Sequence, residues 1–230
     1  MADEASATGE TRRAGHIYRG SGMLSPACPR VPTTGVLYLH GFNSGSASPK
    51  AALMREACVD LGLPCATPDL PHRPDQALDV ATARLAELGD YPLVVGSSMG
   101  GFLATVLAER HDLPGGLVNP AVAPGRLVAD WVGEAFVNPY SSERFVVEED
   151  HRRALAAMTP ERVSPGRYLL LLGTADETLE AAEAFALYQG ARTILHPGGD
   201  HGFSALADYL PAILAQGGHA LAPGRVAARG

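Results

Sequence analysis

Short apolar runs alternate with longer segments of helical periodicity along most of this chain. The runs are continuously apolar, which is typical of strands buried on both faces of a parallel sheet. The apolar runs lie at 36–40, 93–96, 116–119, 168–172 and 193–195, with a shorter one near 65–68. The helical segments lie at 51–61, 75–88, 101–110, 178–189 and 204–216. This alternation predicts βαβ units, and therefore an α/β fold in which a mostly parallel sheet carries helices on both faces.

The alternation stops between residues 120 and 166. This stretch contains Trp131, the segment NPYSSERF and a run of charges at 148–153. We interpret it as a cap-like insertion over the ends of the strands. Within it, the charge run is expected to be the solvated start of a helix, and Asn138 and Tyr140 are expected to be structural.

The two ends of the chain differ from its centre. Residues 1–34 are polar and rich in small side chains, and they predict a loosely ordered N-terminal extension. Residues 217–230 are rich in Gly, Ala and Arg and predict a C-terminal tail. The folded domain is therefore expected over residues 35–216, a length that suits one α/β domain.

Composition narrows the class of protein. Hydrophobic residues make up 46% and charged residues 19% of the 230 positions, as in ordinary soluble enzymes. The net charge of −7 argues against a nucleic-acid partner. We find no apolar run long enough to span a membrane and no apolar centre of a secretory signal. Cys28, Cys58 and Cys65 form no CxxC pattern, so neither a disulfide framework nor a zinc site is indicated, and the simplest expectation is a cytoplasmic protein.

The strongest chemical signal is the sequence GSSMG at residues 96–100. It directly follows an apolar strand and directly precedes a helix, which is the context of a nucleophile elbow. In such an elbow the serine occupies a strained turn, and glycines flank it because a Cβ would clash with nearby backbone. The pattern therefore favours Ser98 as a nucleophile over a capping serine in a glycine-rich turn.

A serine nucleophile requires a base and an orienting acid, which in this kind of fold follow it in the order acid, then histidine. Asp176 follows one apolar strand in GTADETL, and His201 follows the next strand in HPGGDHGF. Both loops reach the carboxyl edge of a parallel sheet, where ligands bind. Glu177 and His196 are the alternatives, and Asp176 could instead cap the helix after it. We favour Asp176 as acid and His201 as base.

Two backbone N–H groups complete the predicted site, because acyl transfer needs donors for the oxyanion. They belong to Met99, directly after the nucleophile, and to Phe42, in the loop after the first strand. The side chains of Phe42, Met99, Trp131 and Phe203 are candidates for an apolar acyl pocket. His40 is expected to be structural and to hold the loop by hydrogen bonds.

Other chemistries lack a pattern in this chain. We find no HExxH, no zinc-spaced Cys and His set, no GxxxxGK[ST] loop and no GxGxxG after the first strand. We therefore expect no metal and no organic cofactor, and a small acyl ester or thioester as the partner. A non-catalytic binding protein, or a transacylase or peptidase with the same three residues, are the alternative functions. The intact order Ser98, Asp176, His201 argues against the binding protein.

Six segments of the chain carry a family resemblance: YLHGFNSGSASPKA, GSSMGGFLAT, VNPAVAP, VNPYSSERFVVEE, GTADETL and GGDHGF. In this order and spacing they resemble the YqiA/YcfP-type small bacterial esterases of the α/β-hydrolase superfamily. The resemblance implies a compact α/β-hydrolase without the superfamily's first strands, acting on acyl esters or acyl-CoA thioesters. It also implies Ser98 as nucleophile, Asp176 as acid and His201 as base. The two chain ends, and Asp200 before His201, depart from the family pattern.

Overall fold

The computed structural model describes residues 31–222. The expected N-terminal extension (1–34) and C-terminal tail (217–230) lie largely outside the described residues. Where both segments enter the described part, they meet, since the Thr33 N–H donates to the Gly217 carbonyl over 2.9 Å.

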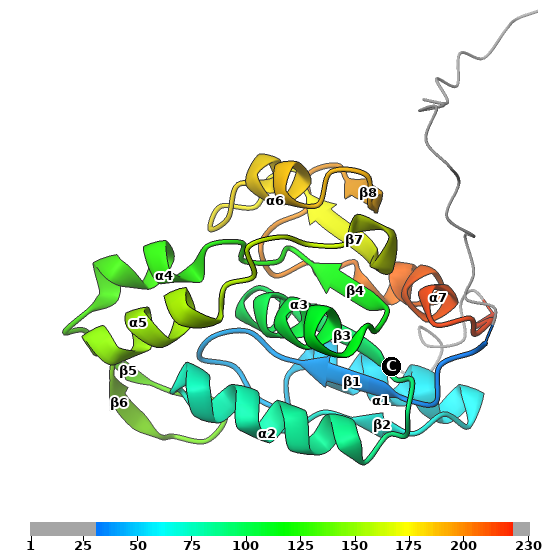
Figure 1. Cartoon of the computed structure of the whole chain (residues 1–230), viewed down its shortest axis with the longest axis horizontal. Helices are drawn as coiled ribbons and strands as arrows, with labels where there is room; N and C mark the ends of the chain where they lie inside the picture. Colours follow the sequence, from blue (N-terminus) through cyan, green and yellow to red (C-terminus); the bar gives the residue numbers. More distant parts are fainter. Residues whose placement is uncertain (1–30, 223–230) are drawn as a thin grey trace, which may run out of the picture.

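A sheet of six parallel strands forms the centre of the described chain, in the order β2-β1-β3-β4-β7-β8. The strands are β1 (Val36–Leu39), β2 (Cys65–Ala66), β3 (Leu93–Ser97), β4 (Gly115–Val118), β7 (Tyr168–Gly173) and β8 (Arg192–His196). Each strand overlaps an apolar run of the sequence. Figure 1 shows the sheet running through the middle of the molecule.

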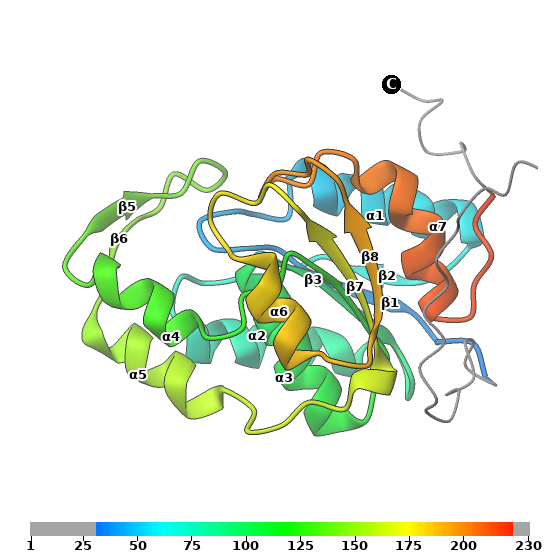
Figure 2. The same cartoon turned by 90° about the horizontal axis from the view of Figure 1, so that it is seen from above.

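Helices cover both faces of this sheet, as Figure 2 shows from above. One face carries α2 (Pro74–Ala86), α3 (Met99–His111) and α6 (Ala181–Leu187), and the other carries α1 (Pro49–Leu61) and α7 (Leu206–Gln216). Successive β1 residues alternate between the two apolar cores, so Leu37 and Leu39 pack under α2 and α3 while Val36 and Tyr38 pack under α1 and α7. The predicted fold class is confirmed.

The ends of two helices are set by individual residues nearby. Helix α1 ends before Gly62, whose φ of 64° is the left-handed value that glycine adopts readily. Helix α6 begins later than the predicted start at 178, because the N–H groups of Thr178 and Leu179 each donate to Asp176 Oδ1 over 2.8 Å. These bonds fold the chain into a local turn that competes with the helix.

The segment between β4 and β7 has secondary structure of its own. Its elements are α4 (Pro124–Leu127), the 3₁₀ turns η1 (Val128–Trp131) and η2 (Pro165–Arg167), the antiparallel strands β5 (Ala135–Val137) and β6 (Arg144–Val146), and α5 (Glu149–Met158). In Figure 1 the β5–β6 hairpin, α4 and α5 lie beyond one end of the sheet, on the left. The first turn of α5 carries exposed Glu149 and Asp150, which confirms that the charge run begins a helix.

Asn138 ties down the tip of the hairpin. Its Oδ1 accepts the N–H groups of Tyr140, at 2.8 Å, and Ser141, at 3.0 Å, and its Nδ2 donates to the Ser44 carbonyl at 2.9 Å. The expected structural role of Asn138 is confirmed, and the last of these bonds joins the hairpin to the loop after β1.

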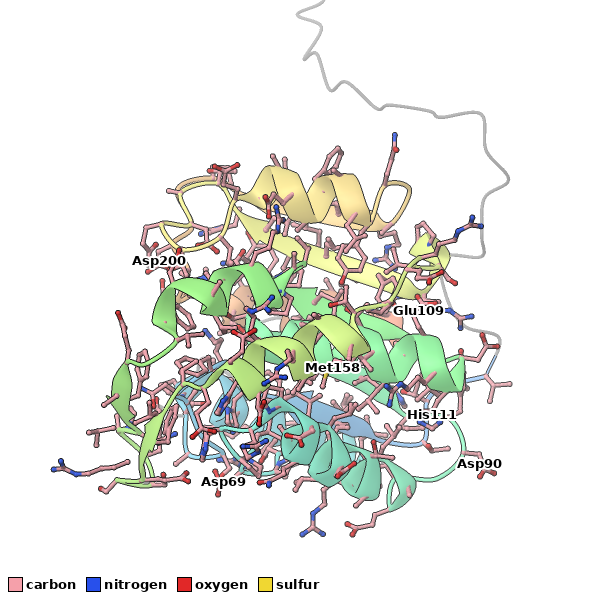
Figure 3. All side chains as sticks on the ribbon, turned by 60° about the vertical axis from the view of Figure 1, so that its left-hand side comes forward. Asp69, Asp90, Glu109, His111, Met158 and Asp200 are labelled. Atoms are coloured by element: carbon pink, nitrogen blue, oxygen red, sulfur yellow. The ribbon has the colours of Figure 1, made fainter. Side chains whose placement is uncertain are left out.

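The loops that follow the strands gather at one end of the molecule. In Figure 3, Asp69, after β2, and Asp200, after β8, lie toward one end, whereas Glu109 and His111, at the end of α3, lie toward the other. The carboxyl edge of the sheet therefore brings together segments that are far apart in the sequence.

Candidate active site

Ser98 occupies the turn between β3 and α3. Its φ of 57° and ψ of −122° are sparsely populated for a residue with a side chain, and strain of this kind costs on the order of 1–3 kcal/mol. The flanking glycines permit the turn, since a Cβ on Gly96 would lie 2.1 Å from the Gly100 carbonyl oxygen and one on Gly100 would lie 2.1 Å from the Leu39 carbonyl oxygen. The local geometry is that of the elbow expected from GSSMG.

Ser98, His201 and Asp176 form one chain of hydrogen bonds. Ser98 Oγ lies 3.0 Å from His201 Nε2, and His201 Nδ1 lies 2.9 Å from Asp176 Oδ2. The Asp176 side chain is 2% exposed and the His201 side chain 23% exposed. With Nδ1–H donated to the carboxylate, the lone pair of Nε2 is available to the serine hydroxyl.

The alternative acid and base lie elsewhere. Glu177 Oε2 accepts the backbone N–H of His201 over 3.0 Å, so Glu177 supports the histidine loop without reaching its ring. His196 Nδ1 pairs with the Tyr209 hydroxyl at 2.8 Å, away from Ser98. The structure therefore brings together the two residues favoured from the sequence and neither alternative.

Two residues that the sequence analysis did not single out support the histidine loop. Asn119, which directly follows β4, donates from Nδ2 to the Asp200 carbonyl at 3.0 Å and accepts the Gly173 N–H on Oδ1 at 2.8 Å. Lys50 Nζ donates to the Gly202 carbonyl at 2.6 Å. Asn119 could have been singled out from the sequence, because it stands at the carboxyl end of a predicted strand. Lys50 could not, because it acts through a tertiary contact that no local sequence pattern reveals.

Lys50 is partly buried beside this loop. Burial lowers the pKa of its ammonium group, and the nearby charges of Asp200 and Asp176 act in the opposite direction. The Asp200 side chain itself is exposed. The carboxylate that departs from the family pattern thus faces solvent and Lys50.

The loop after β1 is held by buried His40. The Leu70 N–H donates to His40 Nε2 over 3.1 Å, so Nδ1 carries the proton and donates to the Gly41 carbonyl at 2.9 Å. Burial lowers the pKa of His40, against the opposing effects of the Gly41 bond and the Asp69 charge, which favours this neutral form. The expected structural role of His40 is confirmed. Since N–H and C=O point in opposite directions across a trans peptide, the bond also fixes the direction of the Phe42 N–H.

The two amides proposed from the sequence for the oxyanion lie beside Ser98. Met99 is the first residue of α3, where a helix leaves its N–H without an intrahelical partner. Neither its N–H nor that of Phe42 donates a hydrogen bond within residues 31–222. A Cβ on Gly41, the residue before Phe42, would lie 3.7 Å from Ser98 Oγ, so the loop passes directly by the nucleophile.

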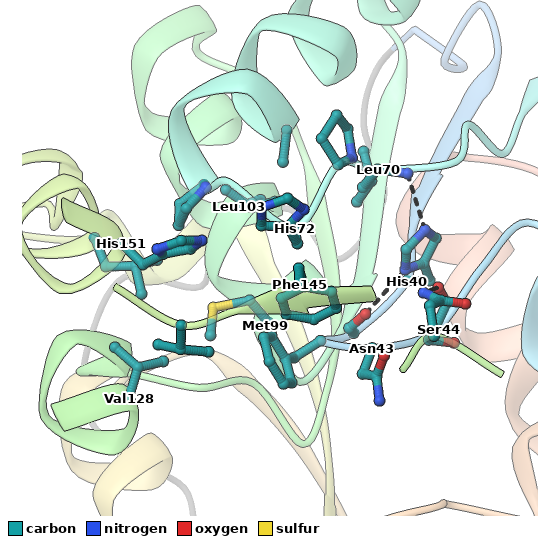
Figure 4. A pocket seen from close by; sticks show the side chains of 18 of the residues that line it. His40, Asn43, Ser44, Leu70, His72, Met99, Leu103, Val128, Phe145 and His151 are labelled. Atoms are coloured by element: carbon teal, nitrogen blue, oxygen red, sulfur yellow. Dashed lines mark hydrogen bonds between the residues drawn. The ribbon is translucent and has the colours of Figure 1, made fainter. Parts of the chain in front are cut away.

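A cavity of about 50 Å³ adjoins these groups. Its walls come from the loop after β1, the loop after β2, α3 and the insertion, and they include Phe42 and Met99 as expected. Figure 4 shows His40 and Asn43 on one side of it, Met99 and Phe145 in the middle, and His151 on the opposite side. The space suits a few water molecules or a short acyl chain.

The other two pocket candidates lie outside this cavity. The Trp131 ring stacks on the Phe42 ring, with centroids 5.0 Å apart, and so lies behind a residue of the wall. Phe203 is 1% exposed and packs against His196 and Tyr209, with centroids 5.5 Å away in both cases. Its position under α7 belongs to the core of the opposite face of the sheet. The structure thus places Phe203 in the core and not in a pocket, against the prediction, because its ring packs in the apolar cluster between the sheet and α7.

A family model described as "Uncharacterised protein family (UPF0227)" matches residues 35–216. The chain belongs to this family. The match confirms the YqiA/YcfP-type resemblance found in the sequence. The UPF0227 match covers the whole described sheet and the insertion.

Solved structures show the fold of this UPF0227 chain. Est1E from Butyrivibrio proteoclasticus is 14% identical with a TM-score of 0.59, over 81% of this chain and 88% of Est1E. The monoacylglycerol lipase of Paleococcus ferrophilus is 16% identical with a TM-score of 0.56, over 80% of this chain and 96% of the lipase. A structure from the work on LipS and LipT, two metagenome-derived lipolytic enzymes, is 16% identical with a TM-score of 0.56, over 80% of this chain and 94% of that one. The fold is that of an α/β-hydrolase.

Neither a metal-binding cluster nor a membrane-spanning helix is found among the described residues of the UPF0227 chain. No group of three or more His, Cys, Asp or Glu side chains within residues 31–222 is arranged to hold a metal ion. In the same part of the chain, every helix is too short or too polar to cross a bilayer.

Proposed function

We propose that this protein is a serine hydrolase that cleaves carboxylic esters or acyl-CoA thioesters through an acyl-enzyme on Ser98. His201 acts as general base and acid, and Asp176 holds its imidazole in the useful tautomer. The backbone N–H groups of Met99 and Phe42 stabilise the oxyanion. The partner is a small acyl ester or thioester, met in the cytoplasm.

The reaction has two halves. Ser98 Oγ attacks the acyl carbon while His201 Nε2 takes its proton, and the carbonyl oxygen becomes an oxyanion. The bond from the acyl carbon to the alcohol oxygen or thiol sulfur then breaks, and the leaving group takes the proton from His201. Water repeats the sequence on the acyl-enzyme, releasing the carboxylic acid and restoring the Ser98 hydroxyl.

The observation that carries this proposal is the unbroken hydrogen-bond chain from Ser98 Oγ through His201 to the buried Asp176 carboxylate, at 3.0 and 2.9 Å. It starts at a strained elbow and ends on a carboxylate with almost no solvent contact. Such a chain supplies the activated nucleophile that acyl transfer needs. The names of the similar solved structures, an esterase and two lipolytic enzymes, support the same reaction class.

The test is hydrolysis of p-nitrophenyl esters from acetate to palmitate, and of the corresponding acyl-CoA thioesters. We expect activity in the wild type and a loss of about 10⁴–10⁶-fold in kcat for Ser98→Ala, since triad members act as a unit. Ser97→Ala is the matched control, because it removes the hydroxyl of the neighbouring buried serine.

A fluorophosphonate probe gives a second readout that does not depend on the choice of substrate. Covalent labelling of Ser98 supports an activated serine. A folded protein that hydrolyses none of the esters or thioesters and takes up no probe contradicts the proposed function and favours the non-catalytic binding protein.

A further inference from the structure

His151 places an unpaired donor against the cavity. The residue is 3% exposed, its side chain lines the cavity, and its Nε2 atom has no hydrogen-bond partner in the described chain. Buried polar atoms in native proteins are nearly always paired, and leaving one unpaired costs free energy. A buried donor without a protein partner therefore requires an explanation.

The hydrogen bonds of His151 fix the character of this atom. The Glu148 N–H donates to His151 Nδ1 over 3.0 Å, as part of the capping box that begins α5. Nδ1 is therefore an acceptor and the proton of the neutral ring lies on Nε2. Burial lowers the pKa of His151, as do the charges of His72 and Arg73, so the neutral ring is favoured. His151, one of the residues that line the cavity, thus carries an unpaired N–H donor.

The space around His151 is narrow and largely apolar. The His72 ring stacks on the His151 ring with centroids 5.3 Å apart, and on the Phe145 ring at 4.5 Å. His72 itself is engaged by Glu143, whose Oε1 lies 3.1 Å from His72 Nδ1. Figure 4 shows His151 across the cavity from the loop that carries the proposed oxyanion amide. Leu155 and Val128 supply apolar wall on the same side.

We propose that the acyl group cleaved at Ser98 carries a neutral oxygen atom that accepts a hydrogen bond from His151 Nε2–H. This inference rests on the proposed function and names its substrate class: short oxoacyl or hydroxyacyl esters or thioesters, in preference to plain alkyl ones. The cavity of about 50 Å³ limits the chain to a few carbons. Glu143, on the cavity wall, opposes a carboxylate as the acceptor because like charges repel.

The expected preference for oxygenated over plain alkyl acyl groups follows from the unpaired donor. A plain alkyl chain that fills the cavity leaves the His151 N–H buried without a partner, whereas a chain with an oxygen at the right carbon satisfies it. Sites built to hydrogen-bond one substrate group reject the analogue that lacks it. We therefore expect a preference of roughly tenfold or more in kcat/KM.

The experiment uses the full chain and three pairs of p-nitrophenyl esters with equal numbers of carbons. The pairs are butanoate with 3-hydroxybutanoate, pentanoate with 4-oxopentanoate, and hexanoate with 5-oxohexanoate. Each kcat/KM is divided by the rate of the same ester with hydroxide, which removes intrinsic differences in reactivity. We expect at least one oxygenated ester to exceed its alkyl partner by about tenfold or more in the wild type.

Substitution of His151 then tests whether this residue causes the preference for oxygenated esters. His151→Phe removes the donor while keeping a flat ring, and we expect the oxygenated-to-alkyl ratio to fall to about one. His111→Phe, the same change at an exposed position at the end of α3, keeps the wild-type ratio. Thermal unfolding of each variant confirms that a folded protein is being assayed.

The outcomes separate this inference from the proposed function. Hydrolysis of alkyl esters with no preference for any oxygenated partner in the wild type overturns the inference and leaves the hydrolase intact, and this comparison needs no variant. A preference that survives in His151→Phe also overturns it. Absence of hydrolysis of every ester contradicts the proposed function and the inference with it.

Discussion

The Asp176 carboxylate serves two parts of the chain at once. One oxygen accepts the N–H groups of Thr178 and Leu179 and thereby shapes its own loop, while the carboxylate also binds the His201 ring at 2.9 Å. The choice between a capping and a catalytic aspartate, left open by the sequence, is therefore not exclusive. The backbone bonds orient the carboxylate so that it can bind the imidazole.

Exchange of the other carboxylate oxygen, Oδ2, for nitrogen separates the two roles. In Asp176→Asn the amide oxygen can keep the turn, but the amide group no longer stabilises the imidazolium or selects the tautomer. We expect kcat for p-nitrophenyl esters to fall by about 10⁴-fold, with the same melting temperature within a few degrees.

Glu177→Gln is the matched control for this prediction. The glutamine oxygen can still accept the His201 N–H, so we expect a loss of less than about tenfold. Equal losses in the two variants would mean that Asp176 is not the acid that orients His201.

At the scale of elements, Asn119 connects the end of β4 to two other segments. Asn119 bonds the end of β7 through the Gly173 N–H and the histidine loop after β8 through the Asp200 carbonyl. It is 3% exposed and lies at a positive φ of 40°, a conformation that asparagine tolerates better than most residues. The position of His201 relative to Ser98 therefore depends on a side chain from the strand between them.

Removal of this side chain is expected to affect both folding and catalysis. Asn119→Ala leaves the buried Gly173 N–H unpaired, and we expect a loss of about 1–3 kcal/mol in unfolding free energy, measured with urea. Because the His201 loop is released at the same time, we also expect kcat to fall by about tenfold or more.

Asn119→Asp provides the comparison. It keeps an acceptor for the Gly173 N–H but lacks the donor to the Asp200 carbonyl, so kcat should fall. Because it also places a carboxylate at a 3% exposed position that faces a carbonyl oxygen, the stability loss should be at least as large as in the alanine variant. An unchanged kcat in both variants would show that Asn119 does not position the histidine.

The strands and most helices could be predicted from the sequence because burial on both faces and helical periodicity leave clear patterns. The start of α6 could not, since the Asp176 turn displaces it through side-chain bonds that periodicity does not report. Ser98, Asp176 and His201 could be singled out as candidates because each follows an apolar run. The cavity lining could be predicted only in part, since Phe203 and Phe42 look alike in sequence and only tertiary packing assigns them to opposite faces of the sheet.

At the scale of the whole molecule, two histidines of the described range, His40 and His151, are buried. Burial is the largest cause that lowers the pKa of both His40 and His151 below the ordinary value. A lowered pKa in the folded state means that the unfolded chain binds protons more readily between the two pKa values. Folding stability is therefore complete above the unfolded value, near 6.5, and is lost as the pH falls toward the folded values.

We expect the unfolding free energy to decrease as the pH is lowered from 7 to 5, by at most about 1.4 kcal/mol per pH unit for each of these histidines. Urea unfolding at several pH values measures the slope. The double variant His40→Asn, His151→Gln should flatten it, whereas His111→Gln, at an exposed position, should not. A stability that is constant or rises over this range would contradict the assignment of both rings as neutral in the folded state.

The benzyl group of Phe42 links the insertion to the loop beside Ser98. The Phe42 ring packs on Trp131, Phe136 and Phe145 of the insertion, with centroids 5.0, 5.1 and 5.7 Å away, while its backbone runs beside the nucleophile. A substitution that removes this aromatic surface of the insertion therefore also removes packing from the loop beside Ser98. The shape of the cavity wall and the position of the Phe42 amide are thus expected to change together.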